Sequence, residues 1–187
     1  MMYNNEVSNE IVNDKVVMLV GDRGTGKTLF AVSLAKYYAD HNINVFTNIT
    51  LKGIHHIPLA FNEIKDFPPF LHDGIIILDE MHVGADSYKF LTKDVQGITN
   101  FITQIRKRNL TFIYITQNYT TIAKRLRLQT NHAYQFTKID DGIAQIDIYD
   151  VMNFYEHLNT IIFNGREFYG YYDTKQIITN EENKENE

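Results

Sequence analysis

The sequence predicts an α/β protein in which a mostly parallel β-sheet is flanked by helices and ends in an antiparallel hairpin. Four short runs are apolar almost throughout, as is typical of strands buried on both faces of a parallel sheet, and they cover 15–20, 43–47, 74–78 and 110–116. Stretches of helical length and spacing follow some of these runs, which is the alternation that gives a parallel sheet. An Asp-Asp-Gly sequence at 140–142 between two later strand-like runs indicates a hairpin turn.

The remaining elements follow from local patterns. A helix is expected after the first strand because the apolar residues there fall mostly on one face. The expected helices lie at 28–40, about 95–108 and about 119–128, with a short one near 62–66. The expected hairpin strands lie at 132–138 and 143–150, with one or two further short strands within 160–172.

The length of 187 residues suits one domain of ordinary size. We expect that domain at 14–179, between a flexible N-terminal arm (1–13) and a disordered acidic tail (180–187). The chain has no cysteine, which excludes disulfides, thiolate metal sites and a cysteine nucleophile. The apolar runs are far shorter than the roughly 20 residues of a membrane span, and the polar start does not resemble a signal peptide, so a cytoplasmic protein without a membrane segment is expected.

The strongest motif is a phosphate-binding loop between the first strand and the first helix. It matches G-x-x-x-x-G-K-[ST] and consists of Gly21, Asp22, Arg23, Gly24, Thr25, Gly26, Lys27 and Thr28. Its backbone N–H groups and the helix N-terminus would surround nucleotide phosphates, and the Lys27 ammonium would reach the β- and γ-phosphates. A glycine turn that binds nothing is the alternative, but strand, loop, Lys-Thr pair and helix all agree with a nucleotide site.

Two carboxylates follow the strand at 74–78. In a phosphate-binding-loop protein, an Asp at this place holds Mg²⁺ together with the loop hydroxyl, here Asp79 with Thr28. The adjacent Glu80 is the candidate general base for the water that attacks the γ-phosphate. The expected ligands are therefore ATP and Mg²⁺. Two solvated charges at a strand end are the alternative interpretation.

Polar residues also stand at both ends of the strand at 110–116. Gln117 follows it and would lie near Asp79 if the two strands are neighbours, where it could contact the γ-phosphate or the attacking water. Arg106 and Arg108 precede it, at the opposite end of the strand, so a neighbouring subunit's site is their more plausible target. The alternatives are an exposed Gln at a loop start and a basic helix end that complements the helix dipole.

Taken together, these residues resemble the FtsK–HerA group of ring-forming ATPases, and within it the zonula occludens toxin (Zot)-like and archaeal-virus genome-packaging ATPases. The resemblance is carried by GDRGTGKT (21–28), IIILDE (75–80), QIRKRNLTFIYITQN (104–118), AKRLRLQTNHAYQF (123–136) and FYGYYDTKQII (168–178). It implies a RecA-like P-loop NTPase fold of the ASCE type. It also implies a homo-oligomeric ring, often a hexamer, that moves double-stranded DNA, with a capsid or portal protein as a further partner.

The resemblance also implies roles for single residues. Lys27 and Thr28 carry over as phosphate and Mg²⁺ ligands, and Asp79 as the Mg²⁺ carboxylate. Glu80 carries over as catalytic base and Gln117 as sensor, while Arg106 carries over as an arginine finger that acts on a neighbouring subunit. Whether Arg106 or Arg108 takes that role stays open, as does a viral, plasmid or cellular origin; a viral member would work in the host cytoplasm.

Charge is distributed unevenly along the chain. The net charge is −5, yet residues 95–139 contain no acid and seven basic residues, which leaves −12 for the rest. Phosphates, on DNA or on a neighbour's ATP, are natural ligands of such a stretch, and DNA would be contacted through its backbone. Its candidate DNA-binding residues are Arg106, Lys107, Arg108, Lys124, Arg125 and Arg127. The alternative is a subunit face that pairs with acids elsewhere.

Two other functions remain open. An ATP-binding switch or loader protein that regulates a DNA-processing partner would use the same site. A nucleotide kinase would need an Arg-rich lid and an acceptor pocket, and the Asp79-Glu80 pair and Gln117 disfavour it.

Overall fold

A computed structural model describes residues 11, 14–64, 67–80 and 95–173. Eight strands in these ranges form one sheet in the order β3-β2-β4-β5-β1-β6-β7-β8. The first six in that order run parallel, and they are β3 (Ile57–Pro58), β2 (Asn44–Thr47), β4 (Gly74–Leu78), β5 (Leu110–Thr116), β1 (Val16–Val20) and β6 (His132–Asp140). The predicted α/β class with a mostly parallel sheet is therefore confirmed.

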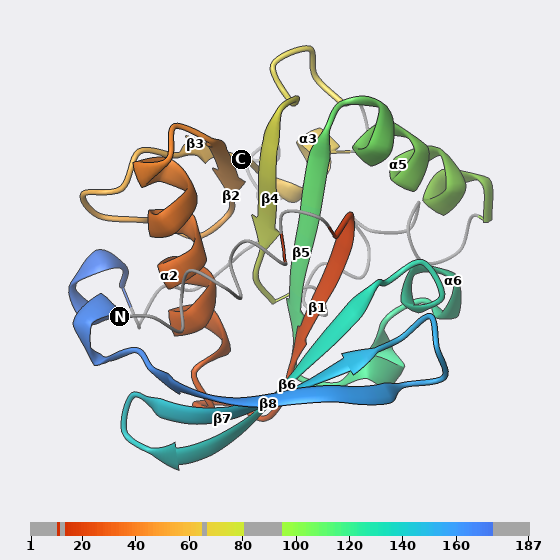
Figure 1. The fold of residues 1–187 in the computed structure, drawn as a ribbon. Helices are drawn as coiled ribbons and strands as arrows, with labels where there is room; N and C mark the ends of the chain where they lie inside the picture. Colours follow the sequence, from red (N-terminus) through yellow and green to blue (C-terminus); the bar gives the residue numbers. More distant parts are fainter. Residues whose placement is uncertain (1–10, 12–13, 65–66, 81–94, 174–187) are drawn as a thin grey trace, which may run out of the picture.

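The C-terminal strands add the antiparallel part of the sheet. β7 (Ile143–Asp150) pairs antiparallel with β6, and β8 (Glu156–Asn164) pairs antiparallel with β7. Gly142 turns the first hairpin with a φ of 70°, a conformation that favours glycine. In Figure 1 these long strands lie at the bottom of the molecule and continue the sheet beneath the first helix.

Helices cover both faces of the sheet. On one face lies α2 (Lys27–Asp40), and on the other lie α5 (Val95–Lys107) and the four-residue α3 (Phe61–Ile64) and α6 (Lys124–Arg127). Side chains of successive β1 residues lie on opposite faces of the sheet, so Val17 packs on the α2 side and Met18 on the α5 side. α2 is buried on most of its surface because the C-terminal strands curve around it: the Phe30 ring lies 5.1 Å from the Phe163 ring of β8.

Two predictions of local structure were wrong in detail. The helix expected at 119–128 is split into the 3₁₀ turn η1 (Tyr119–Thr121) and α6, because Ile122 is extended and buries its side chain. The short strands expected within 160–172 are the end of β8 and the 3₁₀ segment η2 (Arg166–Tyr171). η2 begins after Gly165, whose N–H donates to the Gly142 carbonyl and which packs so closely on Leu29 that a side chain would clash.

Other predictions fall outside the described residues. These are the tail at 180–187, the domain's last residues at 174–179, and the N-terminal arm except Ile11, which is fully buried in the core on the α2 side. None of the helices within the described ranges is long and apolar enough to cross a membrane.

Candidate nucleotide site

The loop at 21–28 joins β1 to α2 through glycines whose positive φ angles disfavour a residue with a side chain. Gly21 has a φ of 152°, and a Cβ there would lie 2.6 Å from the Phe136 carbonyl oxygen of β6. Gly26, at the N-cap of α2, has a φ of 97°. The loop therefore curls tightly at the start of the helix, where free N–H groups and the helix dipole favour an anion.

Lys27 is held inside this loop. Its Nζ donates to the carbonyl oxygens of Gly21 and Asp22, each at 2.7 Å, and the side chain is buried. Burial lowers the pKa of Lys27, and the nearby Asp79 opposes that shift. The Thr25 hydroxyl also donates to the Asp22 carbonyl at 2.8 Å. Gly21 and Asp22 thus support the lysine from outside the cavity, whereas the loop residues from Arg23 to Thr28 line it.

The two predicted Mg²⁺ ligands are in direct contact. The Thr28 hydroxyl donates to Asp79 Oδ2 at 2.6 Å, while Asp79 Oδ1 accepts from the Glu80 N–H at 2.7 Å. Burial raises the pKa of Asp79. A hydroxyl and a carboxylate are oxygen ligands of the kind that Mg²⁺ takes, with phosphate and water oxygens completing its shell. Since the described ranges hold no group of three or more His, Cys, Asp or Glu that could bind a metal ion, these two residues fit a phosphate-bound Mg²⁺ better than an all-protein metal site.

Asn48, directly after β2, was missed by the sequence analysis. Its Oδ1 accepts from the Asp79 N–H at 2.8 Å, and its Nδ2 donates to the Asp79 carbonyl at 3.0 Å. One amide thereby holds both backbone groups of the residue that carries the carboxylate. The available signal was a polar side chain at the carboxyl end of a strand that pairs with β4.

Gln117 lies between the phosphate-binding loop and Glu80. β5 separates β1 from β4, so the residue after β5 falls between the ends of those two strands. Gln117 Nε2 donates to both carboxylate oxygens of Glu80 at 3.3 Å, and its Oε1 accepts from Arg23 Nε at 3.2 Å. Glu80 itself has a φ of 55°, which is uncommon for a residue with a side chain. Arg23, Gln117 and Glu80 therefore form one hydrogen-bonded series.

Arg106 and Arg108 lie away from this site. They flank the end of α5, before the first residue of β5, and the seven residues of β5 span roughly 20 Å to the opposite edge of the sheet. Arg108 Nη1 donates to the Pro68 carbonyl at 2.7 Å, and its guanidinium lies 5.4 Å from the Phe67 ring centroid. The Arg106 side chain is exposed.

The cavity around the loop has a second wall that the sequence analysis did not assign. Its volume is about 390 Å³, and β6, β7, β8 and the C-terminal segment contribute Lys138, Asp140, Asp141, Gly142, Ile143, Ala144, Phe163, Tyr169, Tyr172 and Asp173. β7 comes close to the loop, since a Cβ on Gly26 would lie 3.7 Å from the Ala144 Cβ. The Asp-Gly turn predicted the hairpin, but no local pattern indicated that it would fold onto the phosphate-binding loop.

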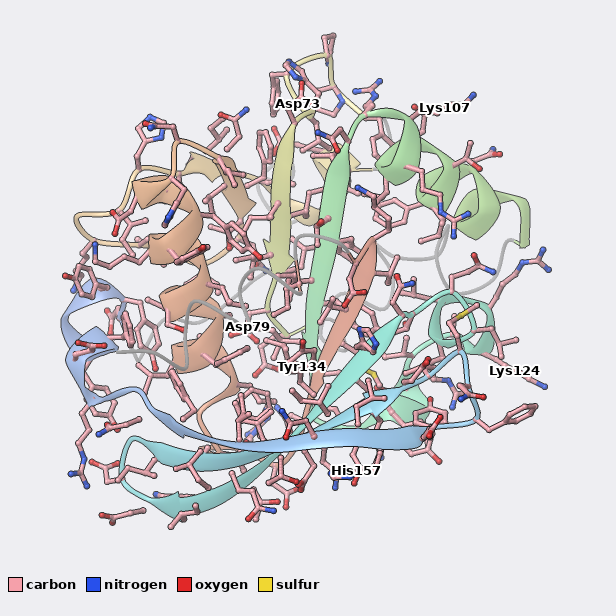
Figure 2. The ribbon with its side chains drawn as sticks, viewed as in Figure 1. Asp73, Asp79, Lys107, Lys124, Tyr134 and His157 are labelled. Atoms are coloured by element: carbon pink, nitrogen blue, oxygen red, sulfur yellow. The ribbon has the colours of Figure 1, made fainter. Side chains whose placement is uncertain are left out.

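The basic stretch expected to form one surface is divided. Figure 2 shows Lys107 at the upper end of the molecule, beside α5, and Lys124 at the lower right, beside α6. On α6, Lys124 and Arg125 are exposed, and the Arg127 guanidinium lies 5.2 Å from the Tyr119 ring centroid. The cations therefore form two separate clusters, one at each of these places.

Comparison with known proteins gives the family. The model described as Novel STAND NTPase 3 matches residues 4–164, most of the chain. The chain belongs to this family. This NTPase is also 24% identical over 212 residues to the Gene 1 protein of Enterobacteria phage I2-2, with 89% of the chain and 58% of that protein covered. The chain thus spans less than two thirds of that curated relative.

Solved structures share its fold. The N-terminal domain of zonular occludens toxin from Neisseria meningitidis has a TM-score of 0.63 at 18% identity, covering 85% of this chain and 98% of that one. The genome packaging NTPase B204 from Sulfolobus turreted icosahedral virus 2, in complex with AMPPCP, has a TM-score of 0.55 at 16% identity, covering 80% and 97%. The flagellar accessory protein FlaH from Methanocaldococcus jannaschii has a TM-score of 0.58 at 12% identity, covering 88% and 92%. The predicted RecA-like fold and the resemblance to Zot-like and viral packaging ATPases are confirmed.

Proposed function

We propose that this NTPase hydrolyses ATP in a Mg²⁺-dependent reaction and uses it to translocate double-stranded DNA, as in viral or mobile-element genome packaging. The observation that carries the ATPase part is the convergence of three groups on one cavity. These are the buried Lys27 ammonium, the Thr28–Asp79 oxygen pair and the Arg23–Gln117–Glu80 series. Together they offer phosphate binding, metal binding and a general base within one site.

The residues divide the chemistry among themselves. The loop N–H groups and Lys27 bind the phosphates, and Lys27 exchanges its contacts with the Gly21 and Asp22 carbonyls for phosphate oxygens. Thr28 and Asp79 hold Mg²⁺, which when bound offsets negative charge on the phosphates. The Glu80 carboxylate accepts the proton of the attacking water, and Gln117 orients that water by its amide.

A complete site requires a second copy of the chain in this proposal. Arg106 is exposed at the edge of the sheet opposite the cavity, so its guanidinium is free to stabilise the phosphoryl group in a neighbouring subunit of a ring, for instance a hexamer. Arg108 fits that role less well, because its guanidinium already donates to the Pro68 carbonyl.

DNA is the proposed cargo. Two basic clusters, around Arg106 to Arg108 and on α6, supply charges for phosphate backbone contacts. Support also comes from the packaging NTPase B204, whose fold this chain shares, and from the phage Gene 1 protein. A capsid or portal protein is the proposed further partner, and the cytoplasm is the proposed location.

The experiment is to measure ATP turnover with and without long linear double-stranded DNA, beside a sizing measurement. Wild-type protein should assemble into a ring and hydrolyse ATP faster with DNA. Lys27→Ala should lose nucleotide binding and turnover, whereas Lys36→Ala, a half-buried lysine of the same helix that pairs with Asp40 and does not line the cavity, should retain both. A monomer whose ATP turnover is the same with and without DNA would contradict translocation. Normal turnover by Lys27→Ala would contradict the assignment of the nucleotide site.

A switch or loader protein is the second candidate. One contact favours it: the Gln117 amide holds both oxygens of Glu80, and a base held in this way would give slow turnover. Slow hydrolysis unaffected by DNA, with nucleotide-dependent binding of a partner, would support this function over the motor.

A further inference from the structure

A second cavity lies on the face of the sheet that packs against α5 and α6. Its volume is about 350 Å³, within the range of small-molecule sites. Met18 and Val20 of β1 and Ala133 of β6 give it an apolar side. Met18 and Ala133 belong to the core on the α5 side, whereas α2 packs on the other face. The sheet therefore separates this cavity from the helix that begins the nucleotide site.

Three tyrosines and an amide line the rest of the described cavity, which we call the tyrosine pocket. They are Tyr119, Tyr149, Tyr155 and Gln135. Tyr119 and Tyr155 are nearly half exposed, at 47% and 44%, and Gln135 is exposed as well. Aromatic rings beside an accessible amide suit a flat ligand with a polar edge, such as a nucleobase. The rings stack on the faces of the base, and the amide can donate to its edge and accept from it.

Cations of α6 lie beside the tyrosine pocket. The Arg127 guanidinium lies 5.2 Å from the centroid of the Tyr119 ring, and that ring lines the pocket. Lys124 and Arg125, on the same short helix, are exposed. Among the described residues none of these three cations forms an ion pair, and the buried Arg127 Nε has no hydrogen-bond partner. Their charge is therefore available to an anion next to the pocket.

Carboxylates lie on the opposite side, where β7 and β8 meet the pocket. They are those of Asp147, which pairs across from Gln135, and of Asp150 and Glu156. None of the three lines the pocket, and each accepts a hydrogen bond from a neighbouring residue of the same hairpin. Because these charges disfavour a phosphate on their side, a bound nucleotide unit would direct its phosphate toward α6 and its base toward the tyrosines.

The turn between β7 and β8 holds Tyr155 at the pocket in an uncommon conformation. Phe154 and Tyr155 have φ angles of 55° and 61°, which are rare for bulky residues. The turn is tied to the segment after α6, since the Val151 N–H donates to the Asn131 carbonyl at 2.9 Å, and it lies beside α6 in Figure 1. Phe154 is 96% exposed. Backbone strain and uncovered aromatic surface are both typical of ligand-binding surfaces.

We propose that the tyrosine pocket and the α6 cations together bind single-stranded DNA, with an unpaired base in the pocket and backbone phosphates at α6. The inference rests on the proposed function in taking DNA as the partner. It adds a site that a duplex cannot fill, because the bases of a duplex are paired and stacked on one another. An unpaired stretch of the DNA is bound here through its bases, whereas a duplex contacts α6 through its phosphates alone.

Fluorescence anisotropy on the full chain tests this inference, with saturating AMPPCP so that DNA phosphates cannot occupy the phosphate-binding loop. The ligands are a labelled oligothymidylate of about 16 nucleotides, a strand of the same length with abasic positions, and a duplex of the same length. Wild-type protein should bind the oligothymidylate at least about tenfold more tightly than either other ligand, which is the gain expected from base–aromatic stacking.

Variants separate base contacts from phosphate contacts. Tyr155→Ala should weaken oligothymidylate binding about tenfold and leave the abasic strand and the duplex unchanged, whereas Tyr155→Phe keeps the ring and should stay within about threefold of wild type. Arg125→Ala should weaken all three ligands, because it removes a phosphate contact. Phe70→Ala, equally exposed at 44% but outside the pocket, is the matched control and should bind all three ligands normally.

Photocrosslinking of wild-type protein tests the same contact without any variant. An iododeoxyuridine base within the oligothymidylate should crosslink to Tyr119, Tyr149 or Tyr155, as located by peptide mapping. Crosslinks to none of these tyrosines, equal affinities for the three ligands, or equal losses of all three in Tyr155→Ala would overturn the inference while leaving the DNA cargo intact.

A sizing measurement on Tyr155→Ala covers the other occupant of such a pocket, a second copy of the chain. An altered oligomeric state with unchanged oligothymidylate binding would overturn the inference and make the pocket a subunit contact. Wild-type protein that binds none of the three DNA ligands would overturn the proposed DNA cargo, and this site with it.

Discussion

At the residue scale, a few hydrogen bonds decide where the two carboxylates of the site point. Asp79 is oriented by the Thr28 hydroxyl and by its own neighbour's N–H, and its backbone is held from both sides by the Asn48 amide. Glu80 leaves the strand in a left-handed conformation, which persists only where surrounding contacts enforce it. Asn48 therefore holds the backbone of the residue that carries one carboxylate and directly precedes the other, and it does not line the cavity.

Replacing Asn48 by Ala should reduce turnover at least about tenfold, because two hydrogen bonds to buried backbone groups are lost, each worth about 1–3 kcal/mol when left unmade. The effect should appear in kcat and in the Mg²⁺ concentration needed for half-maximal rate, with nucleotide affinity in EDTA unchanged. Asn44→Ala is the matched control, since its amide donates to the Asp73 carbonyl at the opposite end of the same strand. A normal Mg²⁺ dependence in Asn48→Ala would refute the positioning role.

At the element scale, β5 connects a residue of the nucleotide site to the proposed arginine finger at the opposite edge of the sheet. Gln117 follows its last residue and lies in the site, while Arg106 to Arg108 precede its first residue. Arg108 binds the loop before β4 through the Pro68 carbonyl and the Phe67 ring. The structure thus separates the two arginines: Arg108 is bound within the fold, and Arg106 is the exposed one that we propose to act on a neighbouring subunit.

Thermal and chemical unfolding should separate them. Arg108→Ala should lower the free energy of unfolding by about 1–3 kcal/mol, because a hydrogen bond to a carbonyl and a cation–π contact are lost. Arg106→Ala should unfold like wild type but lose turnover in the assembled state. Lys107→Ala, exposed between them, controls for loss of charge. Full activity of assembled Arg106→Ala would remove the finger assignment.

Elements whose signals lie in one continuous stretch were predictable from the sequence. The strand, loop and helix at 16–40 and the carboxylates after β4 needed no long-range information. The prediction of one helix at 119–128 was wrong because the Asn118 side chain accepts from the Thr120 N–H and favours a short 3₁₀ turn. The Ile122 side chain that follows this turn is buried in the core. Local competition of this kind is not visible in apolar spacing alone.

At the scale of the whole molecule, strand order decides what the site contains. β6 pairs with β1, so the hairpin that follows lies beside the phosphate-binding loop and brings Ala144 to the cavity, while the segment after β8 brings Tyr169 and Tyr172. The same strand order places Asn48 next to Asp79. These residues could not be predicted from the sequence, because their role depends on pairing between distant segments rather than on any local motif.

The basic residues are also distributed differently in the folded molecule than along the sequence. A stretch that is continuous in sequence becomes two clusters, around Lys107 and around Lys124 (Figure 2). One faces outward from the sheet edge opposite the nucleotide cavity, and the other lies on α6. We therefore expect the two clusters to contact DNA at separate places, with Arg106 of the first cluster directed to a neighbour's nucleotide.

The central claim is that Glu80 acts as the base for ATP hydrolysis, and steady-state phosphate release by Glu80→Gln tests it most directly. The amide keeps the size of the side chain but cannot accept the proton, so turnover should fall about a hundredfold or more while AMPPCP binds as in wild type. Glu156→Gln, an exposed change at the start of β8, should hydrolyse ATP normally. Turnover by Glu80→Gln within a few-fold of wild type would contradict the claim.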